Sequence, residues 1–246
     1  MSRGIRYLLV AVISVLSFTV RAETYVVVVG IANYQYLSGL KLSENDAKSM
    51  AKLYKTRTKN VITITGRYAT RAHIIKAMND QFKRAKANDM VVFFFSGHGY
   101  EGGFCPYDMG KQYSNALSYK DIYAAFRQSK AKRKVIIADA CMSGGLRQEP
   151  SSSHGVSHHT SSDVLLFLSS RTNESSIEYS KMKNGFFTAY LERGLRGGAD
   201  ANKDRMITAK EIFSFVSQGV KSISKDKQHP VMWGSFDDNF VLMDWR

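Results

Sequence analysis

Two short motifs in this chain combine residue types that can break an amide bond. The sequence SGHG occupies residues 96–99, and DACMSGG occupies residues 139–145. A thiolate attacks a carbonyl carbon, a nearby imidazole can accept the thiol proton, and backbone N–H groups can stabilise the resulting oxyanion. We therefore take His98 as the candidate base and Cys141 as the candidate nucleophile. The N–H groups of Gly99 and Cys141 are the candidate oxyanion donors.

Each motif follows a short apolar run, at 90–95 and at 135–138. Runs of this kind bounded by glycine are typical of buried parallel strands, and open α/β sheets place their chemistry at the carboxyl ends of such strands. A histidine or a cysteine alone at a strand end is more often structural. A single predicted helix separates the two strands, so we expect the strands to lie side by side and both residues to reach one edge.

The remaining pattern alternates strands with helices. We expect strands at 24–31, 61–65, 90–95, 134–138, 164–168 and 239–243, and helices at 43–54, 71–87, 118–128, 186–195 and 209–222. Such alternation predicts right-handed crossovers and a mainly parallel sheet covered by helices on both faces. With 246 residues and 44% apolar content, the chain suits one large α/β domain.

The first 22 residues have the pattern of a secretory signal peptide. Arg3 and Arg6 precede the apolar stretch 7–20, and Val20-Arg21-Ala22 is a small-residue cleavage site before Glu23. The apolar run is shorter than the roughly 20 residues that a membrane-spanning helix needs. We therefore expect a mature domain at 23–246 that is secreted or periplasmic, with no stable membrane span after cleavage. An uncleaved anchor is the alternative.

The mature chain stays basic without a pattern typical of nucleic-acid binding. Residues 1–22 hold three arginines and no acidic residue, so the net charge falls from +14 to +11 on cleavage. The other basic residues are scattered along predicted helices, which is typical of solvated faces. We expect no nucleic-acid partner, and a monomer. The only cysteines are Cys105 and Cys141, and we expect both to be unpaired.

The segment 147–162 is rich in serine and histidine and lies between two predicted strands. A segment of this composition cannot form a packed core, so we expect a mobile surface loop. It follows the candidate nucleophile directly.

These motifs resemble the caspase-like cysteine peptidases, a family that includes metacaspases, paracaspases and bacterial relatives of clostripain and gingipains. The resemblance covers nearly the whole mature chain. It rests on residues 96–99 and 139–144, with weaker matches at 26–34, 40–47, 229–231 and 240–242. It implies the three-layer α/β/α caspase-haemoglobinase fold, a His98–Cys141 dyad, and no cofactor for the chemistry. Met142 stands where many metacaspase-like chains have a second histidine, which a dyad does not need.

The resemblance also implies a substrate preference. Metacaspase-like members bind the residue before the cleaved bond with acidic side chains and cut after Arg or Lys. Asp46 and Asp139, with Ser96, occupy those substrate-binding positions, and paired carboxylates can receive a guanidinium in bidentate fashion. A helix-start carboxylate is the alternative for Asp46. Self-cleavage in the loop at Arg147 would be a route to activation, as it is in family members, and a merely disordered loop is the alternative.

A further motif, at residues 200–211, fits the twelve-position calcium loop of an EF-hand. The ligand positions fall on Asp200, Asn202, Asp204, Met206, Thr208 and Glu211. Arg205 replaces the glycine usual at the sixth position. A competing account is complete without metal, because Thr208 and Glu211 can form a capping box and the preceding residues a turn. A structural calcium ion therefore remains one of two interpretations.

Two other function classes compete with an exported cysteine endopeptidase acting on basic protein or peptide substrates. A catalytically silent caspase-like binding module would keep the fold for partner recognition, although intact His98 and Cys141 argue against it. A cofactor-binding doubly wound protein is disfavoured, because residues 30–33 after the first strand lack the G-x-G-x-x-G spacing.

Overall fold

The structure is a computed structural model that describes residues 22–100, 102–140, 164–170, 183–234 and 236–246. Its centre is a six-stranded sheet with strand order β10-β8-β7-β3-β1-β2. All neighbours are parallel except β10, which runs antiparallel to β8. The strands are β1 (Thr24–Gly30), β2 (Val61–Thr65), β3 (Met90–Ser96), β7 (Arg133–Asp139), β8 (Val164–Leu168) and β10 (Val231–Trp233).

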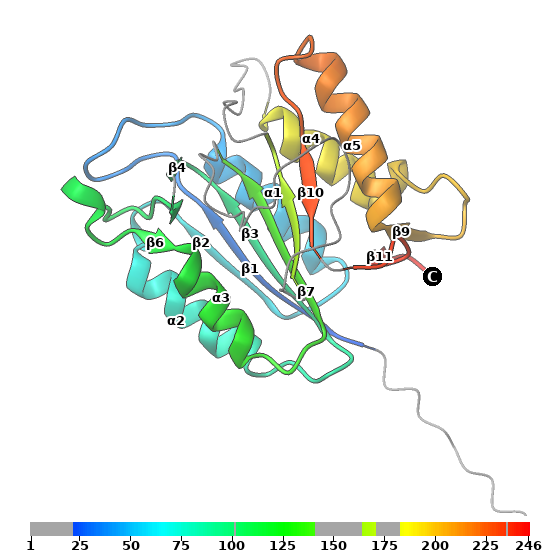
Figure 1. The fold of residues 1–246 in the computed structure, drawn as a ribbon, viewed down its shortest axis with the longest axis horizontal. Coiled ribbons are helices and arrows are strands. Elements are labelled where there is room, and N and C mark those ends of the chain that lie inside the picture. The colour runs from blue at the N-terminus through cyan, green and yellow to red at the C-terminus, as the bar shows by residue number, and fades with distance from the viewer. Residues whose placement is uncertain (1–21, 101, 141–163, 171–182, 235) are drawn as a thin grey trace, which may run out of the picture.

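Helices cover both faces of this sheet (Figure 1). One face carries α1 (Ser43–Lys55), α4 (Phe186–Arg193) and α5 (Ala209–Ile223), and the other carries α2 (Arg71–Phe82) and α3 (Tyr119–Gln128). Because strand side chains alternate between faces, Phe94 packs in the first layer while Phe93 and Phe95 pack in the second. The predicted three-layer α/β/α fold is confirmed.

Two small sheets lie outside the central one. The first joins β4 (Gly99–Tyr100), β5 (Gly103–Phe104) and β6 (Leu117–Ser118), and the second joins β9 (Met206–Thr208) and β11 (Val241–Asp244). Short helical turns occur at Gly66–Tyr68, Lys111–Tyr113 and Gly194–Gly198. The strand predicted at 239–243 thus begins later and pairs with β9. Strands β4, β5, β6, β9 and β10 were not predicted, because segments of two or three residues carry too little alternation to recognise.

The helix predicted at 71–87 ends earlier, at Phe82. The next N–H groups, of Arg84 and Ala85, bond three residues back rather than four, which tightens the chain into turns. The Asp89 carboxylate then accepts the Lys86 N–H at 2.7 Å and closes the last turn. The hydrogen bond to Asp89, a residue beyond the helix, therefore stabilises the turn that separates α2 from β3.

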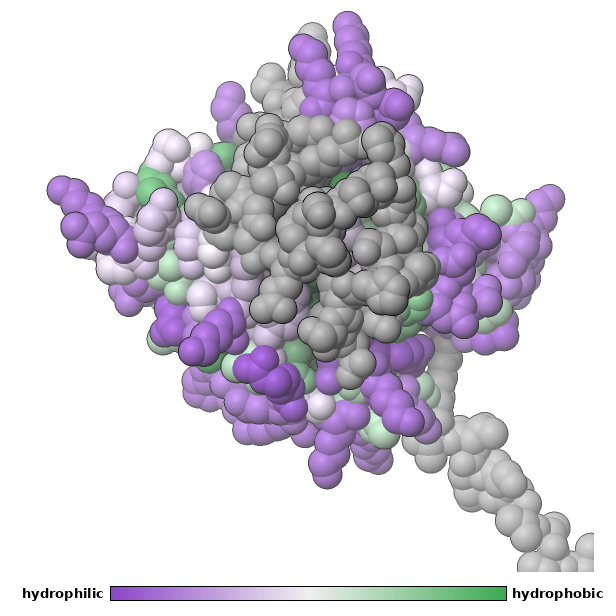
Figure 2. All heavy atoms as spheres, in the orientation of Figure 1, coloured by the Kyte–Doolittle hydropathy of each residue, from purple (hydrophilic) through white to green (hydrophobic). Residues whose placement is uncertain are grey.

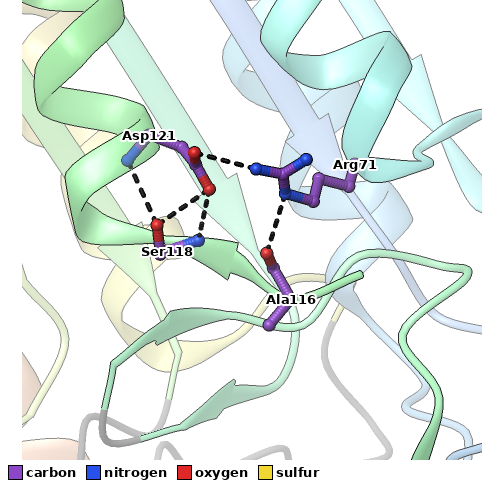
Figure 3. A network of polar contacts seen from close by, with 4 residues as sticks. All are labelled: Arg71, Ala116, Ser118 and Asp121. Carbon is purple, nitrogen blue, oxygen red and sulfur yellow. Dashed lines mark hydrogen bonds and ion pairs between the residues drawn. The ribbon is translucent and has the colours of Figure 1, made fainter. Parts of the chain in front are cut away.

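A polar network holds α2, α3 and the β4–β6 sheet together (Figure 3). Arg71 donates from Nε to the Ala116 carbonyl at 3.0 Å and from Nη2 to Asp121 Oδ1 at 2.9 Å. The second oxygen of Asp121 accepts the Ser118 hydroxyl and N–H, which completes a capping box for α3. The small sheet that continues directly from His98 is thereby fixed to the helical layer.

Helix α1 lies unusually close to the end of β1. A Cβ atom at Gly30 would stand 2.4 Å from the Ser43 carbonyl oxygen and 2.5 Å from the Ala47 Cβ, so only glycine allows this approach. The contact brings the first turn of α1, and with it Asp46, to the carboxyl end of the sheet.

The outer surface is polar. Figure 2 shows mostly hydrophilic side chains over the described helices and projecting loops on the face in view, with scattered hydrophobic residues between them. No helix in the described part of the chain is long and apolar enough to span a membrane.

Candidate active site

The two predicted motifs leave the sheet side by side. Ser96 and Asp139 end the neighbouring parallel strands β3 and β7, and the register pairs them directly. The pairing continues one residue further, because the Gly97 N–H donates to the Asp139 carbonyl oxygen at 3.2 Å. The expected adjacency of the two strand ends is confirmed, and His98 follows at that edge.

His98 is held by the loop that follows β1. Its Nε2 lies 3.0 Å from the Ser38 carbonyl oxygen, and its backbone N–H donates to the Tyr34 hydroxyl oxygen at 2.7 Å. The Tyr34 ring also packs on the imidazole at 5.0 Å between centroids. A carbonyl can only accept, so in the neutral ring the proton belongs on Nε2 and Nδ1 keeps a free lone pair. That tautomer makes Nδ1 the basic atom.

The turn before His98 needs glycine for a steric reason. A Cβ atom at Gly97 would stand 2.5 Å from the Tyr34 hydroxyl oxygen and 3.0 Å from the Phe95 ring. Any side chain there would displace Tyr34 and so remove its two contacts with His98. Beyond the histidine, Gly99 enters β4 opposite Phe104.

Asp46 and Asp139, which the family resemblance placed in one substrate-binding pocket, lie close together beneath this edge. Asp46 comes from α1 and Asp139 from β7, and the two residues are only 2% and 7% exposed. Asp46 accepts the Ser96 hydroxyl at 2.9 Å, the Asn184 amide at 2.9 Å and the Gly185 N–H at 3.0 Å. All three donors are neutral, so hydrogen bonds satisfy the carboxylate without cancelling its charge.

Burial, together with the neighbouring charge of Asp139, raises the pKa of Asp46 to about 8. The hydrogen bonds from Asn184, Ser96 and Gly185 oppose this rise but do not overcome it. At neutral pH the two carboxylates therefore hold one proton between them in the absence of a cation. A cation placed between them would remove the need for that proton.

The start of α4 supplies donors that sequence reasoning did not identify. The Thr188 N–H and hydroxyl both donate to Asp139 Oδ2, at 3.2 Å and 2.8 Å, so a residue from β7 caps this helix. A Cβ atom at Gly185 would lie 2.8 Å from Asp139 Oδ2 and 3.5 Å from Asp46 Oδ2. The Asn184-Gly185 pair before an apolar helix was the only signal in the sequence, and it did not indicate which carboxylates it would meet.

Ser169 is a second residue that was missed. It is fully buried just beyond β8, where its Oγ accepts the Ala140 N–H at 3.2 Å and donates to the Ala140 carbonyl oxygen at 3.3 Å. Its own carbonyl accepts the amide of the buried Gln228 at 2.9 Å. Ala140 is the residue before Cys141, so Ser169 fixes the chain that leads to the candidate nucleophile.

Several predicted features lie outside the described residues. These are Cys141, the segment 147–162 with Arg147, and the signal segment up to residue 21. Their roles stay predictions. Cys105, by contrast, is a free and buried thiol whose pKa burial raises to about 12, which makes it a poor nucleophile.

Residues 200–211, which match the calcium-loop pattern, form the alternative arrangement of a turn followed by a helix cap. Asp200 accepts the N–H groups of Asp204 and Arg205, and Glu211 makes both bonds of a capping box with Thr208. Arg205 has φ 65°, the left-handed conformation that favours glycine. No group of three or more His, Cys, Asp or Glu within the described ranges is arranged to hold a metal ion. Calcium binding stays a prediction, which calorimetry with an Asp200→Ala control tests.

A family model described as the caspase domain matches residues 23–241. The chain belongs to the caspase domain family. Members of this family are cysteine peptidases, which act on protein substrates. The match spans every element of the central sheet, so this caspase-like domain takes up nearly all of the expected mature chain.

Solved structures support the same fold. A crystal structure of a protein from Geobacter sulfurreducens is 18% identical, covering 91% of this chain and 98% of that chain with a TM-score of 0.64. Pro-sf-caspase-1 is 16% identical, covering 90% and 95% of the two chains with a TM-score of 0.61. A search of curated proteins found no match.

The carboxylate pair predicts an unusual pH dependence of stability. Between the pKa of an unfolded aspartate, about 4, and the folded value of about 8, the folded chain keeps a proton that the unfolded chain releases, so stability falls as pH rises. Asp46→Asn keeps the size and the acceptor oxygen but removes this charge. We expect the variant to gain about 4 kcal/mol relative to the unmodified chain between pH 5 and pH 9, at about 1.4 kcal/mol per pH unit up to pH 8, measured by urea unfolding. The exposed Asp80→Asn is the control and should show no gain; an equal pH profile for Asp46→Asn and the unmodified chain would contradict the assignment.

The Ser169 contacts predict a structural cost. Ser169→Ala leaves the N–H and carbonyl of Ala140 without their shared partner and should lower the free energy of unfolding by about 1–3 kcal/mol. Ser217→Ala is a matched control, because its buried hydroxyl has no hydrogen-bond partner among the described residues and its removal should be close to neutral. Equal unfolding midpoints for the two variants would argue against the role given to Ser169.

Proposed function

We propose that this caspase-like protein is an exported cysteine endopeptidase that hydrolyses peptide bonds after Arg or Lys. The observation that carries the proposal is the buried pair Asp46 and Asp139 at the same sheet edge as His98. Two adjacent buried carboxylates are complementary to a cation and repel an acidic side chain. Family membership supports the peptidase chemistry.

The proposed reaction begins with the transfer of the Cys141 thiol proton to Nδ1 of His98. The thiolate attacks the substrate carbonyl carbon, and the oxyanion accepts hydrogen bonds from the Gly99 and Cys141 N–H groups. The C–N bond then breaks as the imidazolium returns its proton to the leaving amine. Water, deprotonated by His98, hydrolyses the thioester and regenerates the thiol. The chemistry needs no cofactor.

The Ser38 carbonyl supports this role for His98. Its contact with Nε2 holds the ring in place and stabilises the imidazolium that forms when Nδ1 takes up the proton. Asp46 and Asp139 would hold the substrate's basic side chain, and Ser96 would keep Asp46 oriented. We further propose that the mature chain acts as a monomer in the secreted or periplasmic space.

A panel of fluorogenic peptides with Arg, Lys or Asp before the leaving group tests the proposal. We expect turnover of the Arg and Lys peptides, none with Cys141→Ala, and a loss of about 100-fold in kcat/KM for the Arg peptide with Asp139→Asn, since a buried charge partner is removed. Turnover of the Asp peptide alone would contradict the basic preference. Absence of thiol-dependent turnover on all three would favour the catalytically silent binding module.

The shared proton predicts that substrate binding depends on pH. A bound guanidinium replaces the proton on the carboxylate pair, so KM for the Arg peptide should fall by about tenfold per pH unit from pH 6 towards the Asp46 pKa of about 8. The matched control is the same peptide with citrulline, which is neutral and nearly isosteric and should show no such trend. The idea fails if the KM of the Arg peptide stays constant across this range while kcat titrates.

Self-cleavage after Arg147 is proposed as the route to activation. The purified unmodified chain should be cut at this position, and Arg147→Ala should remain intact and show a lower initial rate on the Arg peptide. Intact-mass analysis over time measures the cut. A Cys141→Ala chain that is still cut after Arg147 when purified alone would exclude an autocatalytic origin.

A further inference from the structure

Glu23, the residue before β1, is tied to its surroundings through several groups. Its N–H donates to Asp89 Oδ1 at 2.8 Å, and its carbonyl oxygen accepts the Met90 N–H at 2.9 Å. Its carboxylate lies 3.5 Å from the Thr58 hydroxyl oxygen and 3.4 Å from the Asn60 amide nitrogen. Ala22, one residue earlier, is exposed. The backbone nitrogen of Glu23 is therefore the first main-chain atom of the described chain that a buried side chain holds.

Asp89, which holds that nitrogen, is only 5% exposed. Its second oxygen accepts the Lys86 N–H at 2.7 Å. No Lys or Arg side chain of the described residues forms an ion pair with it. Arg133 on β7 interacts with Asp89 electrostatically, but the hydrogen bond from Arg133 Nη2 goes to the Asn88 carbonyl oxygen at 3.0 Å. In the uncleaved chain a buried carboxylate thus faces the neutral amide of Glu23.

We propose that Asp89 is a binding site for the α-ammonium group of Glu23, which signal cleavage after Ala22 creates. The proposal rests on the predicted cleavage site and is independent of the proposed peptidase activity. Asp89 and Glu23 lie at the amino end of β1 and β3, opposite the edge that carries Ser96 and Asp139. Maturation would therefore add an ion pair to the fold without touching the candidate active site.

The covalent step is the hydrolysis of one peptide bond by the signal peptidase of the exporting cell. Water adds to the Ala22 carbonyl carbon, the C–N bond breaks, and Ala22 leaves as a carboxylate. The nitrogen of Glu23 keeps the bonding electron pair and takes up protons to become an ammonium. The hydrogen bond to Asp89 then joins two opposite charges, which makes it shorter and roughly twice as strong as a neutral one. The burial of Asp89 was already complete before cleavage, so the new charge adds attraction without further desolvation of that carboxylate.

The pair has a defined pH window. An α-amino group ordinarily has a pKa of about 8, and the adjacent Asp89 raises it, so the added stability is present below about pH 8 and is lost as pH rises through the folded pKa. The other charged groups facing the pair are Arg133 from β7, the Glu23 carboxylate itself, and Arg84, whose Nη2 donates to Asn60 Oδ1 at 2.9 Å. Both arginines stay charged through this window, so the ammonium is the group that titrates.

The experiment compares two chains, one starting at Glu23 and one that keeps Ala22, each with and without Asp89→Asn. Keeping Ala22 leaves the Glu23 N–H in place and moves the charge by one residue, which is the smallest possible control. At pH 6.5 we expect the Glu23 chain to melt roughly 3–6 °C higher, as a partly buried ion pair should in a domain of this size. The difference should vanish in the Asp89→Asn pair and above about pH 10.

Two results would overturn the proposal. The first is an equal Tm for the Glu23 chain and the Ala22 chain when both keep Asp89, and the second is a Tm difference that persists when both carry Asp89→Asn. Should Asp89→Asn prevent folding, competitive acetylation of the Glu23 chain gives the pKa of its amino group directly; a value above about 8 supports the ion pair and an ordinary value opposes it. Mass spectrometry of the chain recovered after export must also find Glu23 at the amino terminus. A different terminus would also overturn the proposal, whatever the outcome of the peptide panel.

Discussion

Two carboxylates buried side by side destabilise a folded protein unless the surroundings compensate for their repulsion. Asp46 and Asp139 are in this position, and much of the surrounding arrangement serves them. Ser96, Asn184 and Gly185 donate to the first, and Thr188 donates twice to the second. Burial and the neighbouring charge of Asp139 together raise the pKa of Asp46 to about 8, so these hydrogen bonds do not keep both carboxyl groups ionised at neutral pH.

The helices that meet at this pair, α1 and α4, are far apart in the sequence. Helix α1 reaches the sheet edge because Gly30 lets it lie against β1, and α4 begins there because Asp139 caps it. The parallel register of β3 and β7 then sets Ser96 level with Asp139 and places His98 next in the chain. The caspase-like sheet thus brings His98 and the two buried aspartates to one edge.

The sequence predicted what depends on local pattern. Apolar runs located the central strands β1, β2, β3, β7 and β8, and the motifs after two of these runs located His98 and Asp139. Asp46 was identified only through the resemblance to the caspase-like family. Ser169, Asn184 and Thr188 could not be predicted, because their importance comes from partners 29, 138 and 49 residues away. The end of α2 was missed for a similar reason, since Asp89 closes the turn from beyond the helix.

The contact between His98 and Ser38 involves a main-chain oxygen. Replacing the Ser38 side chain leaves that oxygen in place, so systematic alanine scanning would not detect this contact with the His98 ring. Shortening or lengthening the segment between β1 and α1 would move it, whatever residues the segment contains. For this part of the molecule, tolerance to substitution and tolerance to insertion or deletion should therefore be very different.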